Sequence, residues 1–132
     1  KAFNTVSHSH IIAALKQRGM DEHLIALFKN MYENVNTYID MKDDQSDPIK
    51  IQIGVKQGDP MSPLLFNLSI DLLICKLEDK GHGCKHQSNK VTAMAFTDDL
   101  VLLSDSWEGM EKNIGILEVF CNLTGLKTQG EK

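Results

Sequence analysis

The N-terminal part of the chain has apolar residues at the spacing of α-helices. Residues 10–18 predict a first helix, which Gly19 ends. Asp21 is a favourable N-cap for a second helix. The apolar positions that recur along this second helix are Leu24, Phe28, Met31 and Val35. We therefore expect two consecutive helices that pack these apolar positions against a core.

The middle of the chain changes from strand-like segments to a long apolar run. Residues 37–42 and 49–53 are typical of strands, and the polar residues between them predict a hairpin connection. Ser62 and Pro63 suit the N-cap and the first position of a helix. The segment 64–77, LLFNLSIDLLICKL, is apolar on nearly all sides, so we expect this helix to be buried at the centre of the fold.

Residues 93–104, AMAFTDDLVLLS, set two adjacent carboxylates between two short apolar runs. Each run is too short for a helix and suits a buried strand, which predicts a hairpin with Asp98 and Asp99 at its tip. Asp-Asp is a poor two-residue turn, because such turns prefer Asn-Gly or Asp-Gly. Repulsion between two carboxylates at close range adds about 4 kcal/mol at intermediate dielectric.

Two interpretations of Asp98 and Asp99 are open from this hairpin alone. Aspartates are common in turns, where their carboxylates simply face water. Alternatively, the pair holds divalent cations, because Mg²⁺ binds hard carboxylate oxygens and completes its octahedron with phosphate oxygens and water.

The last periodic segment predicts a C-terminal amphipathic helix that ends near Gly125. Its apolar positions are Trp107, Met110, Ile114, Leu117 and Cys121. The order of helices and strands along the chain predicts an α+β fold, in which helices pack on one face of a small antiparallel sheet.

Composition limits the function classes. With 132 residues the chain forms one domain at most, and no apolar run is long enough to span a bilayer. The net charge of −4 argues against an autonomous nucleic-acid binder, but not against an acidic catalytic centre that works through metals. Three widely spaced cysteines predict no disulfide framework and an intracellular, reducing compartment. The chain begins at Lys1 and not at a methionine, so we expect it to be a piece of a longer protein.

A second segment with chemical content is GVKQGDPMSPLLF, residues 54–66. Gly54 and Gly58 let the backbone approach another molecule closely, and the Gln57 amide can both donate and accept hydrogen bonds. The same residues are also compatible with a loop that only joins a strand to a helix.

Four segments in series resemble the reverse transcriptases of non-LTR (LINE-type) retrotransposons. KAFNTVSH at residues 1–8 resembles the end of the first palm motif of that family, and GVKQGDPMSPLLF matches the second. AFTDDL at residues 95–100 matches the metal-binding third motif, and GLKTQGEK at residues 125–132 resembles the fourth. The resemblance covers residues 1–132 as a partial reverse transcriptase domain and implies a polymerase palm-like α+β fold, without complete fingers, thumb or endonuclease.

The resemblance also implies roles for individual residues. Asp98 would be a catalytic ligand of Mg²⁺, and Asp99 beside it would have a lesser or indirect part. Two Mg²⁺ ions about 4 Å apart would then activate a primer 3′-hydroxyl and hold the triphosphate. Gln57 and Gly58 correspond to positions that contact the incoming nucleotide.

The resemblance also implies roles for one aromatic and one basic residue, and each has a structural alternative. Phe3 falls at the steric-gate position, where a ring occupies the space of a 2′-hydroxyl, although a core aromatic is the alternative. Lys132 matches a lysine that would donate a proton to the departing pyrophosphate, with a solvated terminal lysine as the alternative.

The sequence departs from the family pattern at several positions that bear on activity. The third metal carboxylate of the family lies three residues before the position of Lys1, and Asn4 stands where a second Asp is usual. Thr97 replaces a small Ala, and Gln129 replaces a common Asn. We expect the isolated chain not to polymerise, and a catalytically dead remnant that acts only as a binding or structural domain is the alternative function.

The resemblance further implies an RNA template, a DNA primer and deoxynucleoside triphosphates as partners of the complete enzyme, acting in the nucleus. A rival metal site is HGCKH, which places His82, Cys84 and His86 at alternate positions. All three residue types bind zinc, but a structural site needs four ligands and no fourth is near. A surface loop is therefore the favoured interpretation of this segment.

Overall fold

The computed structural model describes residues 2–42, 44–56 and 58–128. Its elements before the long central helix are η1 (Ala2–Asn4), α1 (His8–Gln17), α2 (Glu22–Glu33), β1 (Asn36–Thr37), β2 (Asp40–Met41), β3 (Asp44–Gln45) and β4 (Ile49–Lys50). The elements that follow are α3 (Ser62–Lys80), β5 (Cys84–His86), β6 (Asn89–Val91), β7 (Ala93–Phe96), β8 (Asp99–Leu102) and α4 (Trp107–Thr124). The mixed α+β class predicted from the sequence is confirmed.

Helices α1 and α2 confirm two of the predicted helices, but α1 begins earlier and α2 buries a partly different face. α1 begins two residues earlier than predicted, because the Ser7 side chain accepts a hydrogen bond from the His10 N–H and caps the helix. The N-cap of α2 is Asp21, as predicted, and its carboxylate accepts from the His23 N–H at 2.8 Å. The predicted core face of α2 is wrong in part, since Met31 is 47% exposed and Ile25 is buried in its place.

Helix α3 starts one residue before the predicted position. Ser62 is its first helical residue and not the N-cap, and its hydroxyl donates to the Lys56 carbonyl at 2.5 Å. Burial follows one stripe of the helix, while Leu64 is 55% exposed, so the expectation of a helix buried on all sides is wrong. The buried residues of this stripe are Ser62, Leu65, Phe66, Ser69, Leu73 and Leu77.

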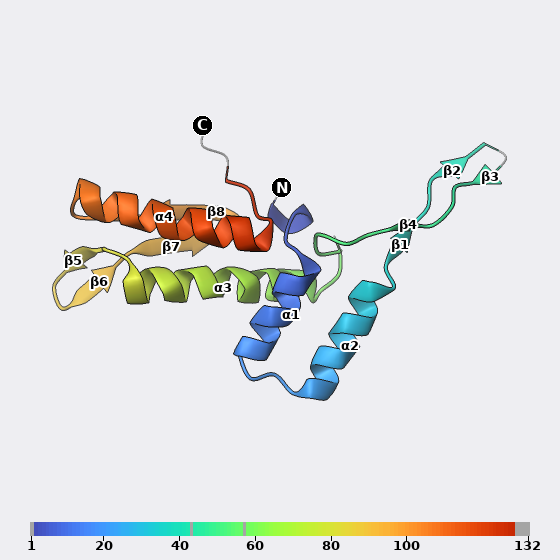
Figure 1. Ribbon diagram of the computed structural model, residues 1–132, viewed down its shortest axis with the longest axis horizontal. Coiled ribbons are helices and arrows are strands. Elements are labelled where there is room, and N and C mark those ends of the chain that lie inside the picture. Colours follow the sequence, from blue (N-terminus) through green and yellow to red (C-terminus); the bar gives the residue numbers. More distant parts are fainter. Residues whose placement is uncertain (1, 43, 57, 129–132) are drawn as a thin grey trace.

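The strands form four separate two-stranded antiparallel ladders in the described part of the chain, where one small sheet was predicted. β1 pairs with β4 and β2 with β3, which builds an arm that projects away from the helices (Figure 1). The two strands predicted over residues 37–42 and 49–53 thus exist only as short exposed ladders. Helices α3 and α4 lie side by side and contact β7 and β8 respectively, so the predicted helix-covered face is found at the β7–β8 hairpin.

Helix α4 is capped at both ends, but its buried face differs from the predicted apolar face. The Ser106 hydroxyl accepts from the Gly109 N–H at its start, and Gly125 ends it in the left-handed conformation, as predicted. Trp107, expected in the core, is 78% exposed and its indole N–H donates to Glu111. The buried residues on α4 are Gly109 and the polar Asn113 and Thr124.

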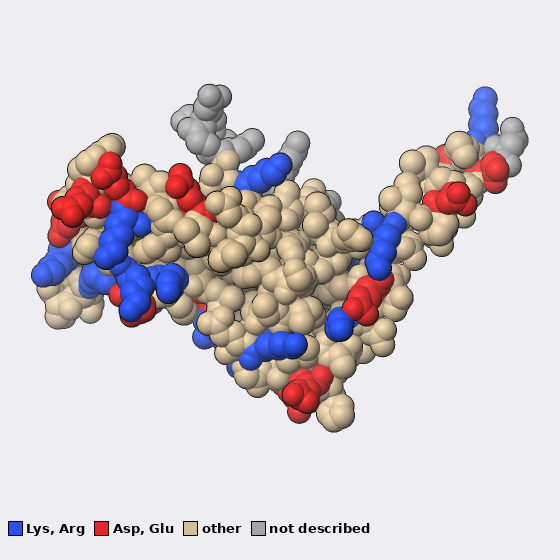
Figure 2. Space-filling model, in the orientation of Figure 1, with Lys and Arg blue, Asp and Glu red and all other residues tan. Residues whose placement is uncertain are grey.

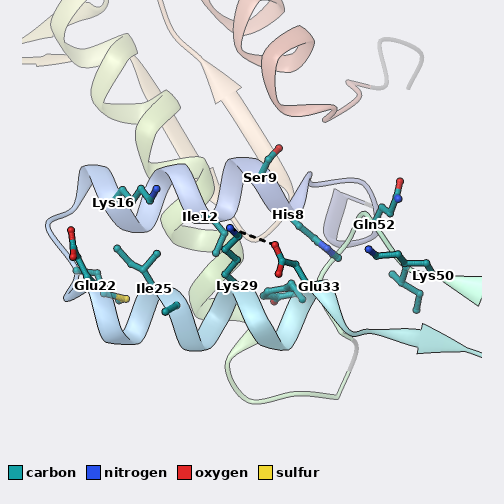
Figure 3. Close-up of a pocket in the computed structure, with 14 residues that line it drawn as sticks. His8, Ser9, Ile12, Lys16, Glu22, Ile25, Lys29, Glu33, Lys50 and Gln52 are labelled. Carbon is teal, nitrogen blue, oxygen red and sulfur yellow. Dashed lines mark ion pairs between the residues drawn. The ribbon is translucent and has the colours of Figure 1, made fainter.

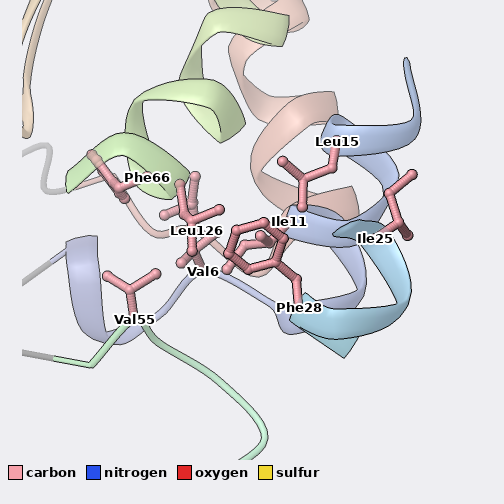
Figure 4. Close-up of a cluster of buried hydrophobic side chains, with 9 residues drawn as sticks. Val6, Ile11, Leu15, Ile25, Phe28, Val55, Phe66 and Leu126 are labelled. Atoms are coloured by element: carbon pink, nitrogen blue, oxygen red, sulfur yellow. The ribbon is translucent and has the colours of Figure 1, made fainter. Parts of the chain in front are cut away.

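One hydrophobic core joins both ends of the chain. Figure 4 shows Val6 and Leu126 within a cluster that also receives side chains from α1, α2, α3 and the loop before α3. Its buried members are Val6, Ile11, Leu15, Ile25, Phe28, Val55, Leu65, Phe66 and Leu126.

Residues 3–8 make backbone hydrogen bonds to the loop before α3 and to the end of α4. The Phe3 and Val6 carbonyls accept from the N–H groups of Val55 and Gly54, both at 2.8 Å. The Ser7 N–H donates to the Thr124 carbonyl at the end of α4, at 3.1 Å. The N-terminal segment therefore holds the loop before α3 on one side and the end of α4 on the other.

The approach of this loop requires glycine at position 54. Gly54 has φ +84°, and a Cβ there would lie 2.9 Å from the Asn4 Cα. Gly58 has φ +85° but open space around it, and Gly115 within α4 has open space and no positive φ.

We expect Gly54→Ala to lower the free energy of unfolding by about 2–4 kcal/mol, because left-handed strain and a backbone clash combine. Gly58→Ala is the matched control for strain without a clash and should cost about 1 kcal/mol. Gly115→Ala should stabilise the helix by up to about 1 kcal/mol. Urea denaturation of the three variants measures the order; equal losses for Gly54→Ala and Gly58→Ala would contradict the close approach.

Candidate active site

The tip of the β7–β8 hairpin is shifted by one residue from the prediction. In the ladder Phe96 pairs with Asp99, which leaves Thr97 and Asp98 as the two-residue turn. Asp99 is the first residue of β8 and not part of the turn. The two aspartates therefore have different backbone environments: one lies in the turn and the other on a strand.

The hairpin has one covered and one open face. Leu100 and Leu102 are half-buried on the side of the helices, whereas Phe96 is 78% exposed. The expectation of two buried strands is therefore wrong for the described chain. Because Phe96 and Asp99 are directly opposite in the antiparallel ladder, their side chains share the open face. The Asp99 carboxylate thus lies at the end of an exposed apolar strip that continues through Met94 and Val101.

Thr97 makes the turn possible at a conformational cost. Its φ is +53°, in the left-handed region that β-branched residues rarely adopt. The Thr97 hydroxyl donates to the Asp98 carboxylate at 3.2 Å. The Asp98 backbone N–H and this hydroxyl together hold the pKa of the Asp98 carboxyl below its usual value. Asp98 is therefore a carboxylate at neutral pH, the form that a cation binds.

The donor set fits Mg²⁺ in part. Asp98 and Asp99 are exposed carboxylates, the ligand type that Mg²⁺ takes one or two of alongside phosphates and water. The described residues hold no group of three or more His, Cys, Asp or Glu side chains that could hold a metal ion. The segment around His82, Cys84 and His86 is not the surface loop that was expected, because Cys84–His86 form strand β5, which pairs with β6.

Of the predicted nucleotide-binding residues, the structure describes Phe3 and Gly58. The Phe3 ring is half-buried and stacks on the Phe66 ring, with centroids 4.3 Å apart and planes 19° apart. Gly58 is exposed in the loop before α3, where the Asp59 carboxylate accepts from the Met61 N–H at 2.8 Å. Gln57 and Lys132, like Gln129, lie outside the described residues.

A small cavity of about 100 Å³ lies against the turn. Asp98 and Asp99 line it together with apolar side chains of α3 and α4 and with residues 126–128. Cys121 is one of these lining residues, and burial followed by the nearby Glu118 raises the pKa of its thiol, which stays protonated at neutral pH. The turn therefore borders a small cavity whose lining is mostly apolar.

A larger groove, about 860 Å³, lies between α1 and α2 and contains none of the predicted site residues. Figure 3 shows Lys16, Lys29 and Lys50 around it, together with Glu22 and Glu33. Lys29 and Glu33 form an ion pair at 3.6 Å. Its mixed charges give no single ligand chemistry, so the β7–β8 turn remains the candidate site.

The surface charge is divided and not uniformly basic. Figure 2 shows Lys and Arg side chains gathered at the end of the molecule that carries β5 and β6, with Asp and Glu side chains beside them. Exposed lysines on the elements at this end are Lys76, Lys80, Lys85 and Lys90. Among the described helices, none is both long and apolar enough to cross a membrane.

Sequence analysis missed two residues that shape the hairpin. Thr97 was noted only as a departure from the family pattern, and its positive φ follows from the ladder register. Asn113 was passed over between the apolar positions Met110 and Leu117 of α4. A polar amide on the apolar side of a helix was the signal that could have identified it.

Comparison with known proteins follows the same segments. The chain matches the family described as "Reverse transcriptase (RNA-dependent DNA polymerase)" over residues 1–132. It is 37% identical over 134 residues to a retrovirus-related Pol polyprotein from type-1 retrotransposable element R2 of Popillia japonica, covering 100% of this chain and 19% of that protein.

Two further relatives also match this chain over its whole length. The chain is 34% identical over 132 residues to the retrovirus-related Pol polyprotein from type-2 retrotransposable element R2DM of Drosophila melanogaster, covering 100% of this chain and 12% of that protein. It is 25% identical over 134 residues to the transposon TX1 uncharacterized 149 kDa protein of Xenopus laevis, again over 100% of this chain. The chain thus spans between a tenth and a fifth of the length of these relatives.

Thr97→Gly tests two effects of Thr97: the backbone strain of the turn, measured as the free energy of unfolding, and the lowered pKa of Asp98. Relief of the left-handed strain exceeds the backbone entropy that glycine adds, so we expect the free energy of unfolding to rise by about 0.5–1 kcal/mol. Loss of the hydroxyl should also raise the pKa of Asp98 toward its usual value, which NMR titration of the carboxyl carbon measures.

The sign of the pH effect follows from the lowered pKa of Asp98. Its contribution to stability is present above the unfolded-state pKa and is lost as the pH falls through the lower folded-state pKa. Gln87→Gly is the matched control, because Gln87 is another residue with positive φ, at +55°, far along the chain from Asp98. It should give a similar gain in stability with no change in the pKa of Asp98; an unchanged pKa in Thr97→Gly as well would contradict the hydroxyl contact.

Proposed function

Because the chain belongs to the reverse transcriptase (RNA-dependent DNA polymerase) family, of the kind carried by non-LTR retrotransposons, we propose that it is the palm segment of a longer RNA-templated DNA polymerase. One observation carries the proposal: two adjacent carboxylates lie at the end of the β7–β8 hairpin, and one face of this hairpin packs on α3 and α4. A charged turn backed by two helices is a fixed platform for metal-dependent chemistry.

The chain's own part in the reaction is to place negative charge. Asp98, held ionised by its backbone N–H and by Thr97, would hold Mg²⁺ directly, and Asp99 would act from the open face of β8. Two Mg²⁺ ions bound at this turn would activate the primer 3′-hydroxyl and stabilise charge on the phosphates. A third protein carboxylate would come from outside the described residues, which contain no group of three or more His, Cys, Asp or Glu that could hold an ion.

Nucleotide selection is proposed for residues near the N-terminal end of α3. Phe3 would exclude a 2′-hydroxyl from the sugar site, with Phe66 supporting the ring from behind. Gly58 and Gln57 would contact the incoming nucleotide, and Lys132 would protonate the departing pyrophosphate. The template RNA, the DNA primer and deoxynucleoside triphosphates are the proposed partners, and the nucleus is the proposed site of action.

The alternative function, a catalytically dead remnant that only binds or supports other parts, is favoured by Asn4, which lacks the charge that is usual in the family at this position. RNA-templated primer extension by the full-length protein that carries this segment decides between the two. Extension that depends on Mg²⁺ and on Asp98 supports the polymerase, and its complete absence supports the remnant.

In the full-length protein we expect Asp98→Asn to lower the single-turnover rate of primer extension by about 10²–10³-fold, because transition-state charge stabilisation of this kind is worth about 3–4 kcal/mol. Asp99→Asn should cost less, since its carboxylate lies on the strand face beside Phe96 and not in the turn. Asp105→Asn, an exposed aspartate outside the hairpin, is the control and should leave the rate unchanged. Equal losses for positions 98 and 99 would refute the hierarchy.

Phe3→Ala tests the steric gate in the same assay. If the ring excludes the 2′-hydroxyl, the ratio of kcat/KM for ribonucleotides to kcat/KM for deoxyribonucleotides should rise. Phe66→Leu is the control, because it removes the stacking partner but keeps the Phe3 side chain, so the ratio should rise less than in Phe3→Ala. A parallel fall of both kcat/KM values in Phe3→Ala, with an unchanged ratio, would assign Phe3 to the core alone.

A further inference from the structure

Asn113 is a fully buried amide at the base of the β7–β8 hairpin. Its side-chain N–H groups donate to the His82 carbonyl at 2.8 Å and to the Leu103 carbonyl at 3.1 Å. Its side-chain oxygen accepts from the His82 N–H at 2.9 Å. One side chain of α4 therefore joins the segment after α3 to the residue that follows β8.

These contacts lie where the hairpin leaves the helices. The Leu103 N–H donates to the Thr92 carbonyl at 2.8 Å, which extends the β7–β8 pairing by one step beyond the ladder. Leu103 is thus held on both sides: through its N–H by Thr92 and through its carbonyl by Asn113.

Two glycines near Asn113 are in close contact with neighbouring segments. A Cβ at Gly81 would lie 2.7 Å from the Asn113 side-chain oxygen. A Cβ at Gly109, one turn earlier on α4, would lie 2.4 Å from the Ser104 hydroxyl and 2.7 Å from the His82 Cβ. The segments that meet here are therefore in direct contact, and the amide is enclosed among them.

We propose that Asn113 is a positioning residue that fixes the base of the β7–β8 hairpin and thereby sets where the Thr97–Asp98 turn and the adjacent Asp99 stand against α3. The proposal rests on the proposed polymerase function, because it assigns a purpose to the position of the turn. The tip is five residues beyond the clamped base, roughly 15 Å along a strand, so a small rotation at the base moves the carboxylates by a larger distance.

The amide group is needed for this role because of its hydrogen-bonding pattern. Two carbonyls and one N–H converge on position 113, and only an amide offers two donors and one acceptor in so small a volume. Thr92 does not share these contacts: its buried hydroxyl lies against Gly83 and has no hydrogen-bond partner among the described residues. Leucine at position 113 would keep the branched shape and the number of heavy atoms but remove all three contacts.

Amide hydrogen exchange of the 132-residue chain, followed by NMR, tests the clamp. In Asn113→Leu we expect the Leu103 N–H and the β7–β8 amides to exchange roughly ten- to a hundredfold faster relative to the Ile25 N–H, which lies in α2. Asn113→Ala should give the same pattern, and it serves if the leucine variant does not fold. The exposed Asn122 lies on the same helix, so Asn122→Ala is the matched control and should leave the ratio unchanged. Acceleration that is uniform over the whole chain, or absent from the hairpin, would overturn the proposal.

Paramagnetic broadening by Mn²⁺ tests the effect on the turn, which a purely structural role would not change. An ion held at Asp98 should broaden the amides of Asp98 and Asp99 and those of Phe66 and Leu126, which line the same cavity. In Asn113→Leu the broadening at Phe66 and Leu126 should fall at least severalfold relative to that at Asp99, whereas Asn122→Ala should keep the ratio.

The two measurements separate failure of this proposal from failure of the proposed function. An unchanged broadening ratio in Asn113→Leu would show that Asn113 does not position the turn. If Mn²⁺ broadens no amide of the unsubstituted chain near Asp98, the proposed metal site fails, while hydrogen exchange still decides whether Asn113 holds the hairpin.

Discussion

The fold depends on the hydrogen bonds that residues 3–8 make in two directions. On one side the carbonyls of Phe3 and Val6 hold the loop that leads into α3, and on the other the Ser7 N–H holds the end of α4. Val6 is fully buried between these contacts. Because buried backbone groups need partners, this short segment fixes the start of α3 and the end of α4 at the same time. The β7–β8 hairpin packs on those two helices, so its position depends on the same constraint.

Local signals in the sequence predicted the helices but not which of their faces is buried. The N-cap Asp21 and the stop at Gly125 depend on groups within one turn, and both are found. Helix α2 carries one apolar stripe through Leu24, Leu27 and Met31 and another through Ile25 and Phe28, and periodicity alone cannot choose between them. The contact with α1 makes the choice, which is information that lies outside α2.

The candidate site was predictable as a pair of residues but not as a geometry. The sequence placed Asp98 and Asp99 between two short apolar runs, and the hairpin exists. The one-residue shift of the turn could not be derived, because it requires Thr97 to adopt a backbone conformation that its side chain disfavours. The shift divides the pair into a turn aspartate with a lowered pKa and a strand aspartate on an open apolar face. The exposure of that face, unexpected for apolar strands, follows from helices that cover one side of the hairpin and not the other.

The core that joins Val6 to Leu126 has a consequence for how the chain folds as it is made. Helices α1 and α2 contact each other early in the chain, so they can associate as soon as both have left the ribosome. Their shared core is not closed until the residues after α4 arrive, because Leu126 fills part of it. Contacts of such long sequence separation form slowly. During synthesis the part of the core that Leu126 fills therefore stays open until the residues after α4 have left the ribosome.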